Sequence, residues 1–182
     1  EGGNWILGKK SKVAVRAVFP DGTPLVLQGS IEGEEGTSFN TNAAGLGKLE
    51  FTPQQADYTA LLQDPISGTT RRIELPKALQ SGLSIHVQNP SDGSVISALI
   101  QGVGVSGKLL LVTHTRGLIN YMAEGTLVNG VWGVRIPKKN LPSGIHTIAL
   151  LDEQGRPLLE RLVFVQNKDE LNLELNSTSG PL

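Results

Sequence analysis

Apolar and polar residues alternate with a period of two along almost the whole sequence, and this pattern limits the possible folds. In residues 12–19, for example, Val13, Val15, Ala17 and Phe19 would share one face of an extended chain. A helix would need a period near 3.6 instead. The 22 glycines and 10 prolines break the apolar runs roughly every eight to twelve residues. The sequence therefore predicts an all-β sandwich or barrel protein.

The first part of the chain is expected to hold six strands. Their ranges are 12–19, 25–31, 37–42, 45–53, 57–64 and 69–76. Residues 76–82 are the one place where we expect a short helical turn, and their Pro, Ser and Gly are typical of a junction. We place a domain boundary at residue 82.

The second part is expected to hold seven strands joined by short turns. Their ranges are 83–89, 94–101, 108–115, 117–123, 130–137, 144–152 and 157–165. Seven strands are the count of an immunoglobulin-like or fibronectin-like sandwich. We therefore expect two tandem seven-stranded β-sandwiches of this type, one over residues 1–82, where alternation marks six of the strands, and a second over residues 83–168. Residues 169–182, in which leucines alternate with polar residues, are expected to be a linker and the start of a following domain.

The last predicted hairpin has a polar turn at residues 152–155 between two arms that are apolar on nearly both faces. Such arms are typical of strands central to a sheet. We expect Phe164 to be buried. Glu160 and Arg161 interrupt the second arm on opposite faces, so at least one of them should be paired or should extend its charged end to solvent.

Composition narrows the possible partners. The formal net charge is −1, from 16 basic and 17 acidic residues that are spread along the chain. No basic block favours nucleic acid, and no apolar run approaches the ~20 residues of a membrane span. Arg71, Arg72, Lys138 and Lys139 are expected on solvated strand faces. There is no cysteine, which excludes disulfides, thiolate metal sites and a cysteine nucleophile.

No motif predicts catalysis, a cofactor or a metal. Residues 102–107 match the G-x-G-x-x-G spacing of dinucleotide sites, but a predicted strand follows where such a site needs a helix. His86, His114 and His146 each stand alone in a predicted strand, without the carboxylates or further histidines of a zinc site. No G-x-S-x-G marks a nucleophilic serine. We expect a protein that is not an enzyme.

Four aromatic side chains could stack against a sugar ring. They are Trp5, Tyr58, Tyr121 and Trp132. Carbohydrate-binding modules need several such rings on one surface, whereas a single Trp in a sandwich strand packs in or beside the core. We expect that packing role for Trp132. Asn176 lies in an Asn-Ser-Thr sequence, which matters only where proteins are N-glycosylated.

Several stretches resemble the macroglobulin-like β-sandwich domains of large bacterial envelope proteins, especially those of Bacteroidota. They are EGGNWILGKKSKVAVRAVFPDGTPL at the N-terminus, GLGKLEFTP with Gly45, Gly47, Phe51 and Pro53, YTALL, and LPSGIHTIALLDEQGRPLLERLVFV. The resemblance covers nearly the whole chain. It implies two consecutive domains of the macroglobulin type from a longer array, distantly similar to α2-macroglobulins. The thioester of that family needs a cysteine, which this sequence lacks.

Three functions are compatible with these features of the sequence. The first is a non-enzymatic structural or interaction module of the bacterial cell envelope, in the periplasm or at the cell surface, which spaces partners or docks them at its sheet edges or in the groove between the two sandwiches. Its partners would be other domains of the same parent chain and an envelope protein or a glycan. The alternative is a carbohydrate-binding accessory module of an envelope enzyme or transporter. The third is an accessory domain of a hydrolase, which would need the histidines to meet carboxylates in one pocket.

Overall fold

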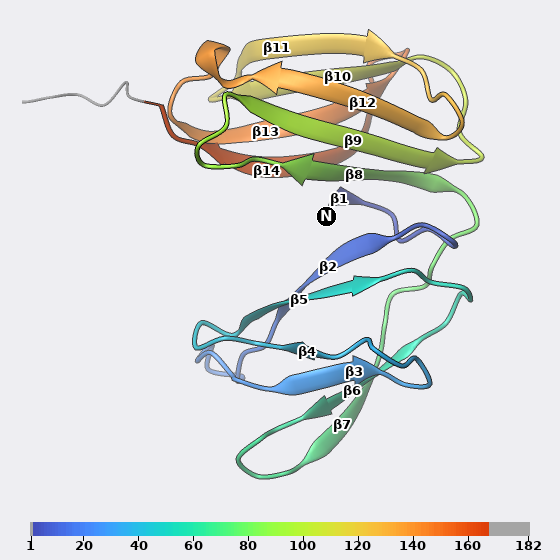
Figure 1. Ribbon diagram of the computed structural model, residues 1–182, viewed down its shortest axis with the longest axis vertical. Coiled ribbons are helices and arrows are strands. Elements are labelled where there is room, and N and C mark those ends of the chain that lie inside the picture. Colours follow the sequence, from blue (N-terminus) through green and yellow to red (C-terminus); the bar gives the residue numbers. More distant parts are fainter. Residues whose placement is uncertain (1, 168–182) are drawn as a thin grey trace, which may run out of the picture.

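The computed structural model describes residues 2–167, and these residues form strands arranged in two lobes (Figure 1). The strands are β1 (Gly2–Gly3), β2 (Ser11–Arg16), β3 (Gln28–Ile31), β4 (Phe39–Asn40), β5 (Leu46–Phe51), β6 (Thr59–Gln63), β7 (Thr70–Glu74), β8 (Gly82–Gln88), β9 (Val95–Val103), β10 (Leu109–Thr115), β11 (Leu118–Gly125), β12 (Val131–Pro137), β13 (Gly144–Asp152) and β14 (Pro157–Val165). A single 3-10 turn, η1 (Lys138–Asn140), is the only helix of the described part. The prediction of an all-β fold is confirmed. All thirteen strands expected from the alternation are present, and β1 is one more.

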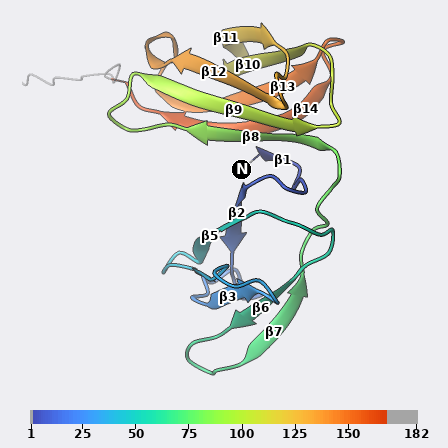
Figure 2. The same ribbon diagram turned by 45° about the vertical axis from the view of Figure 1, so that its right-hand side comes forward.

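The second lobe consists of β1 and β8–β14. They form two antiparallel four-stranded sheets, with the orders β1-β8-β9-β12 and β11-β10-β13-β14, which lie face to face (Figure 2). Alternate residues of these strands point into one shared core. Ile85, Ile100, Leu111, Ile136 and Leu150 are all fully buried there. This lobe is a closed sandwich.

The first lobe consists of β2–β7. Strands β2 and β5 form one sheet, and β4, β3, β6 and β7 form another. The two sheets meet where Thr41 bridges Gly47 and the Asn42 N–H donates to the Leu46 carbonyl over 2.9 Å. The strands thus follow one curved path from β2 to β7, which are its two outer strands. These six strands are one fewer than the seven expected of each sandwich.

The N-terminal strand β1 belongs to the sheet of the second lobe, although the strands that follow it along the chain build the first lobe. Gly2 and Gly3 pair with Ile85 and Ser84 of β8. A Cβ at Gly2 would lie 2.5 Å from the Glu160 carbonyl oxygen, and Gly3 has a φ of 98°. Only glycine fits both positions, because the backbone here approaches β8 and β14 too closely for a side chain.

The position of Phe164 corrects one prediction. Strand β13 is central in its sheet, as expected, but β14 is an edge strand. Leu159, Val163 and Val165 of β14 point into the core, so Phe164 points outward and is 61% exposed. Because residues 157–165 are apolar on both faces, alternation alone did not identify the inner face.

Two smaller predictions are also wrong. Residues 76–82 form no helical turn; the Leu79 N–H instead donates to the Trp5 carbonyl over 2.7 Å, and Leu79 bridges Ile6. Lys138 is not on a solvated strand face. It lies in η1 with 6% exposure, and its Nζ donates to the Pro90 carbonyl.

Candidate docking surfaces

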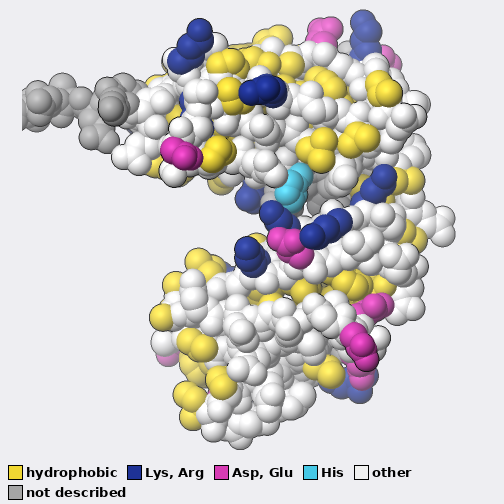
Figure 3. Space-filling view, viewed as in Figure 1, with side chains coloured by type: hydrophobic (Ala, Val, Ile, Leu, Met, Phe, Trp, Pro, Cys, Tyr) yellow, Lys and Arg dark blue, Asp and Glu magenta, His cyan; other side chains and the backbone are white. Residues whose placement is uncertain are grey.

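A groove with a cavity volume of about 1070 Å³ lies between β2 and β7 and opens into the cleft between the lobes (Figure 3). The first lobe contributes its apolar wall, including Val13, Leu62 and Ile73. The second lobe contributes polar side chains, including His86 and Arg161. The groove exists because the curved path of strands in the first lobe is not closed between its two outer strands.

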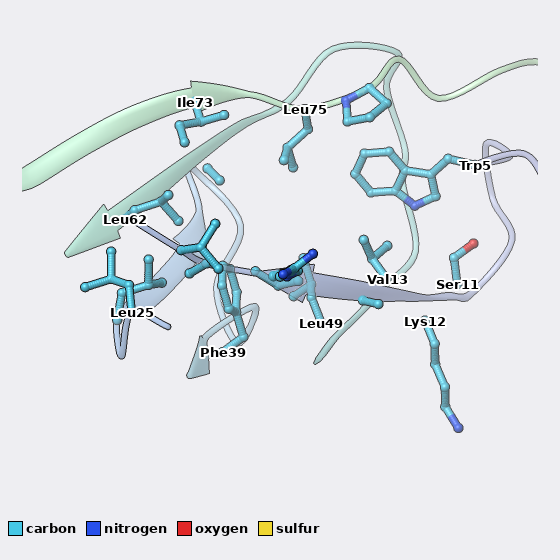
Figure 4. A pocket seen from close by; sticks show the side chains of 18 of the residues that line it. Trp5, Ser11, Lys12, Val13, Leu25, Phe39, Leu49, Leu62, Ile73 and Leu75 are labelled. Atoms are coloured by element: carbon cyan, nitrogen blue, oxygen red, sulfur yellow. The ribbon is translucent and has the colours of Figure 1, made fainter. Parts of the chain in front are cut away.

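Apolar side chains from both sides of the groove line its inner wall (Figure 4). Val13 and Val15 of β2 point toward it on one side, and Ile73 of β7 and Leu75 just after it line the other. Ile73 is 48% exposed, which is high for an isoleucine that faces the inside of a sandwich. The groove therefore leaves apolar side chains in water that a further strand would cover.

Trp5 lines one end of this surface and packs against Phe51 and Tyr58. The Trp5 ring centroid is 5.6 Å from that of Phe51 and 5.8 Å from that of Tyr58. The Tyr58 hydroxyl accepts hydrogen bonds from the backbone N–H groups of Gln54 and Gln55, over 2.7 and 3.1 Å. This bond from a tyrosine to backbone a few residues upstream is the tyrosine corner of Greek-key sandwiches. Tyr58 is only 5% exposed, so it acts in packing.

The rim of the groove is basic. Its charged lining residues are Lys10, Lys12, Arg16, Arg71, Lys77 and Arg161 on the basic side, against Asp64 on the acidic side. Lys and Arg side chains gather on both sides of the cleft in Figure 3. Lys10 pairs with Glu50 over 2.8 Å and Lys77 with Asp57 over 3.0 Å. Arg16, Arg71 and Arg161 have no salt bridge to a carboxylate within residues 2–167.

Two hydrogen-bond donors that line the groove lack acceptors. Trp5 Nε1 and Arg161 Nε are buried, and neither has a hydrogen-bond partner in the described part of the chain. A buried donor without an acceptor costs about 1–3 kcal/mol. These two atoms are therefore places where an acceptor of a bound molecule would be stabilised. We expected Glu160 or Arg161 to be paired or to extend its charged end to solvent. Neither residue forms a salt bridge within residues 2–167, but Glu160 is exposed on the edge strand β14, as the second alternative requires.

A second candidate surface is the outer face of the sheet β11-β10-β13-β14. Strand register places Phe164 beside Ile145, and Leu162 in one row with Thr147, His114 and Ile119. The next row holds Glu160, Ala149, Val112 and Met122. Phe164, Ile145, Leu162, Ile119 and Met122 are each more than half exposed. This face is an apolar patch across all four strands.

The outer face of the opposite sheet differs. Residues that point outward from β8, β9 and β12 include Ser84, His86, Ser97, Gln101 and Arg135, with Leu99, Val95 and Val131 as apolar exceptions. One face of this sandwich thus has the polar surface expected of a sheet in water, and the other does not. Solvent exposure alone does not explain an apolar face of this extent.

The structure places the other two aromatic candidates in the second lobe. Trp132 of β12 packs beside the core and covers Gly125, where a Cβ would lie 2.2 Å from the indole ring. The Tyr121 hydroxyl donates to the Arg135 carbonyl over 3.3 Å. The four candidate rings thus divide into two pairs that pack on different cores. Their role in ligand binding stays a prediction.

The histidines lie in three strands of the second lobe. His146 is fully buried, and its Nε2 is 2.7 Å from the Pro142 carbonyl oxygen, so it is part of the packing at the start of β13. Residues 2–167 contain no group of three or more His, Asp or Glu side chains that could hold a metal ion. Residues 102–107 comprise the end of β9 and most of the loop to β10, and β10 is the strand expected after them. No helix of the described part could cross a membrane.

Sequence reasoning expected docking at sheet edges or in a groove between the two sandwiches, but it did not foresee the groove between β2 and β7 or the apolar face. The apolar face had a signal, because Leu158, Leu162 and Phe164 are the second apolar set of a strand that already had one. The groove had none, since it depends on how far β2 and β7 are held apart. Leu171, Leu173, Leu175 and Asn176 lie outside the described residues.

Comparison with known proteins gives distant structural likeness but no match in sequence. No family model matches the sequence, and no curated protein matches it. Among solved structures, the chain is similar to the crystal structure of dimeric latent PorU from Porphyromonas gingivalis, at 12% identity and a TM-score of 0.48. The match covers 86% of this chain and 18% of that chain, so this chain spans less than a fifth of its length. A likeness this distant identifies neither a family nor an activity, and the macroglobulin-type assignment stays a prediction.

Proposed function

We propose that this chain is a non-enzymatic interaction module of a larger bacterial cell-envelope protein, in which it docks a neighbouring protein surface. The observation that carries this proposal is the apolar outer face of the sheet β11-β10-β13-β14. The location in the envelope and the macroglobulin type rest on the sequence resemblance alone.

The outer face has the composition of a protein contact. Phe164, Leu162 and Met122 are large, apolar and exposed; the first two lie on β14 and Met122 lies on β11, at opposite edges of one sheet. Burial of each such side chain is worth about 1.5–3 kcal/mol, which would contribute directly to docking. Interface cores are enriched in aromatic residues and Met and depleted in charge, and Glu160 is the one charged residue of β14 that shares the outer face with Leu162 and Phe164.

A site-specific photocrosslink tests the proposal. A benzophenone amino acid replaces Leu162 in the protein that contains this chain, in its own cell envelope. The matched control places the same amino acid at Ser97, which is exposed on the polar outer face of β9. Mass spectrometry of the adducts identifies the crosslinked residues.

We expect position 162 to form an adduct with one defined protein segment, and position 97 to form none. An adduct with a domain of the same parent chain and one with a second protein both support docking. Equal, unspecific labelling at the two positions, or no adduct at position 162, would overturn the proposal. Adducts with glycan at position 162 would instead favour the carbohydrate-binding alternative.

A further inference from the structure

We propose that the groove between β2 and β7 binds an extended peptide strand in which apolar residues alternate with acidic ones, and that this strand hydrogen-bonds to the open edge of β2. The inference goes beyond the proposed docking face. It concerns the groove of the first lobe and uses none of the residues on the outer face of the sheet β11-β10-β13-β14. It commits to a peptide of this chemistry as the occupant.

The edge of β2 has backbone groups ready for a partner strand. The Ala17 N–H donates to the Gly45 carbonyl over 2.8 Å, which continues the register that pairs Val15 with Gly47 and Val13 with Leu49. In an antiparallel pair, alternate residues direct their backbone groups to the same side. The N–H and C=O groups of Ala14 and Arg16 therefore point away from β5, toward the groove edge where the described residues place no strand.

The two faces of such a strand would meet different surroundings. Its inward side chains would lie between Val13 and Val15 of β2 and Ile73 of β7, which all line the groove. These neighbours favour apolar residues. The inward set would cover the exposed part of Ile73 and complete the open side of the first lobe.

The outward side chains would face the basic cleft. Arg16 is exposed on the outer side of β2, and Arg161 of the second lobe lines the same cavity. Opposite charges directly across two strands are stabilising. Arg161 Nε also lacks a hydrogen-bond acceptor, which a carboxylate would supply. Acidic residues at the alternate positions therefore fit this side.

The same charges disfavour a second copy as the occupant. Two β2 edges that paired with each other would bring Lys and Arg side chains of both copies together, and like charges across a strand pair are destabilising. The basic edge thus opposes self-pairing while it selects an acidic strand. Main-chain bonds would provide affinity, and the alternate pockets would provide specificity.

The test uses the whole chain and fluorescein-labelled synthetic peptides, with binding measured by anisotropy at low and high salt. The probe is the acetylated nonapeptide EVTLEVTLE, and its control KVTLKVTLK has lysine at each acidic position. Ala14→Pro removes an N–H donor from the open edge of β2. Ala14→Val keeps that donor and suits a strand. Arg16→Glu reverses one charge at the rim, and its matched control is Arg16→Gln.

We expect the glutamate peptide to bind at least about tenfold more tightly than the lysine peptide at low salt, with a smaller ratio at high salt. Arg16→Glu should lower that ratio more than Arg16→Gln does, and Ala14→Pro should abolish binding that Ala14→Val retains. Circular dichroism shows whether Ala14→Pro still folds, and the Arg16 pair decides if it does not.

Three results would overturn the inference: equal binding of both peptides, no binding at millimolar concentration, or equal binding to the folded Ala14→Pro and Ala14→Val variants. None of them bears on the docking face, which is tested at position 162. Conversely, the absence of a crosslink at Leu162 leaves the peptide measurements intact. The failure of one proposal can therefore be told from the failure of the other.

Discussion

The two lobes are built from the same alternation of apolar and polar residues, yet one closes and the other stays open. The second lobe has two four-stranded sheets, and fifteen buried residues form its core cluster. The first lobe has sheets of two and four strands, and its core cluster has seven buried residues. These counts refer to residues 2–167.

The difference shows what an added strand contributes: β1 completes the second lobe, and the first lobe has no equivalent strand in the described part of the chain. By pairing with β8, the two residues of β1 give the second lobe an eighth strand. This strand comes from the N-terminus of the chain, whereas the other seven strands follow the first lobe in sequence. The first lobe has no such addition between β2 and β7 in the described part of the chain. Small cores bury a lower fraction of their surface and are less stable, so the first lobe should be the weaker of the two.

The largest expected effect is in the closed core. Leu150 of β13 is fully buried, and Leu150→Ala should cost about 2–5 kcal/mol of unfolding free energy, because the neighbouring side chains cannot collapse into the space. Urea unfolding followed by Trp132 fluorescence measures this loss. The Trp5→Phe background removes the signal of the first lobe, because each core has one of the two tryptophans beside it.

The matched change in the open lobe is Leu62→Ala, at a partly buried leucine of the groove wall. We expect a smaller loss than for Leu150→Ala, observed through Trp5 in a Trp132→Phe background. An equal loss at the two positions would mean that the groove is as well packed as the closed core, and would contradict the comparison.

An intermediate effect is expected at the tyrosine corner. Tyr58→Phe leaves the N–H groups of Gln54 and Gln55 without their acceptor while the ring contacts with Trp5 and Phe51 remain. The first lobe should lose about 1–2 kcal/mol, close to the usual worth of a part-buried hydrogen bond. Urea unfolding observed through Trp5 measures this loss, and the transition observed through Trp132 should stay in place. A loss in both transitions would show that the lobes unfold as one unit.

A smaller effect is expected at Phe164. Because its ring is 61% exposed, Phe164→Ala should cost less than about 1 kcal/mol, as for other surface changes. A buried Phe at this position would have cost about 3–5 kcal/mol. Urea unfolding of the second lobe decides whether Phe164 faces outward or inward. The control is Val163→Ala on the inner face, which should lower the unfolding free energy more than Phe164→Ala does.

This contrast shows how far the sequence could specify the molecule. Alternation placed the strands because each face of a half-buried strand is uniform in polarity. It did not identify the inner face of β14, where Leu158, Leu162 and Phe164 are as apolar as Leu159, Val163 and Val165. Closure of a lobe was also out of reach. It depends on pairing between residues far apart in sequence, as between Gly2 and Ile85, for which a glycine pair is the only local sign.

The groove likewise has some features that the sequence indicated and others that only the fold shows. Trp5 was one of four candidate rings for ligand stacking, and it lines the groove, while its role in binding stays a prediction. Tyr58 was also a candidate, but its hydroxyl is used in the corner and its ring is buried. The basic rim could not be foreseen, since Arg16, Arg71 and Arg161 are distant in sequence and only the fold brings them to one cavity.

The smallest expected effect is on the acid dependence of stability, and it arises from one aspartate in a hairpin turn of each lobe. In the β13–β14 turn, the N–H groups of Arg156 and Gln154 donate to Asp152 Oδ1 over 2.9 Å each, and they and the Arg156 guanidinium hold the pKa of Asp152 below its ordinary value. In the β6–β7 turn, the Ser67 hydroxyl and the Ile66 N–H likewise lower the pKa of Asp64. Both bonding patterns favour the ionised carboxylate in the folded chain.

A carboxyl group whose pKa is lower in the folded state adds stability that is present above its unfolded pKa of about 3.9 and is lost as the pH falls through the folded value. Asp152→Asn should therefore make the second lobe less sensitive to acid below pH ~4, and Asp64→Asn should do the same for the first lobe only. Urea midpoints of the two tryptophan signals between pH 2 and pH 6 measure both. If Asp152→Asn changed the acid response of the first lobe instead, the two lobes would not unfold separately, and the difference between the open and the closed lobe would describe their packing but not their stability.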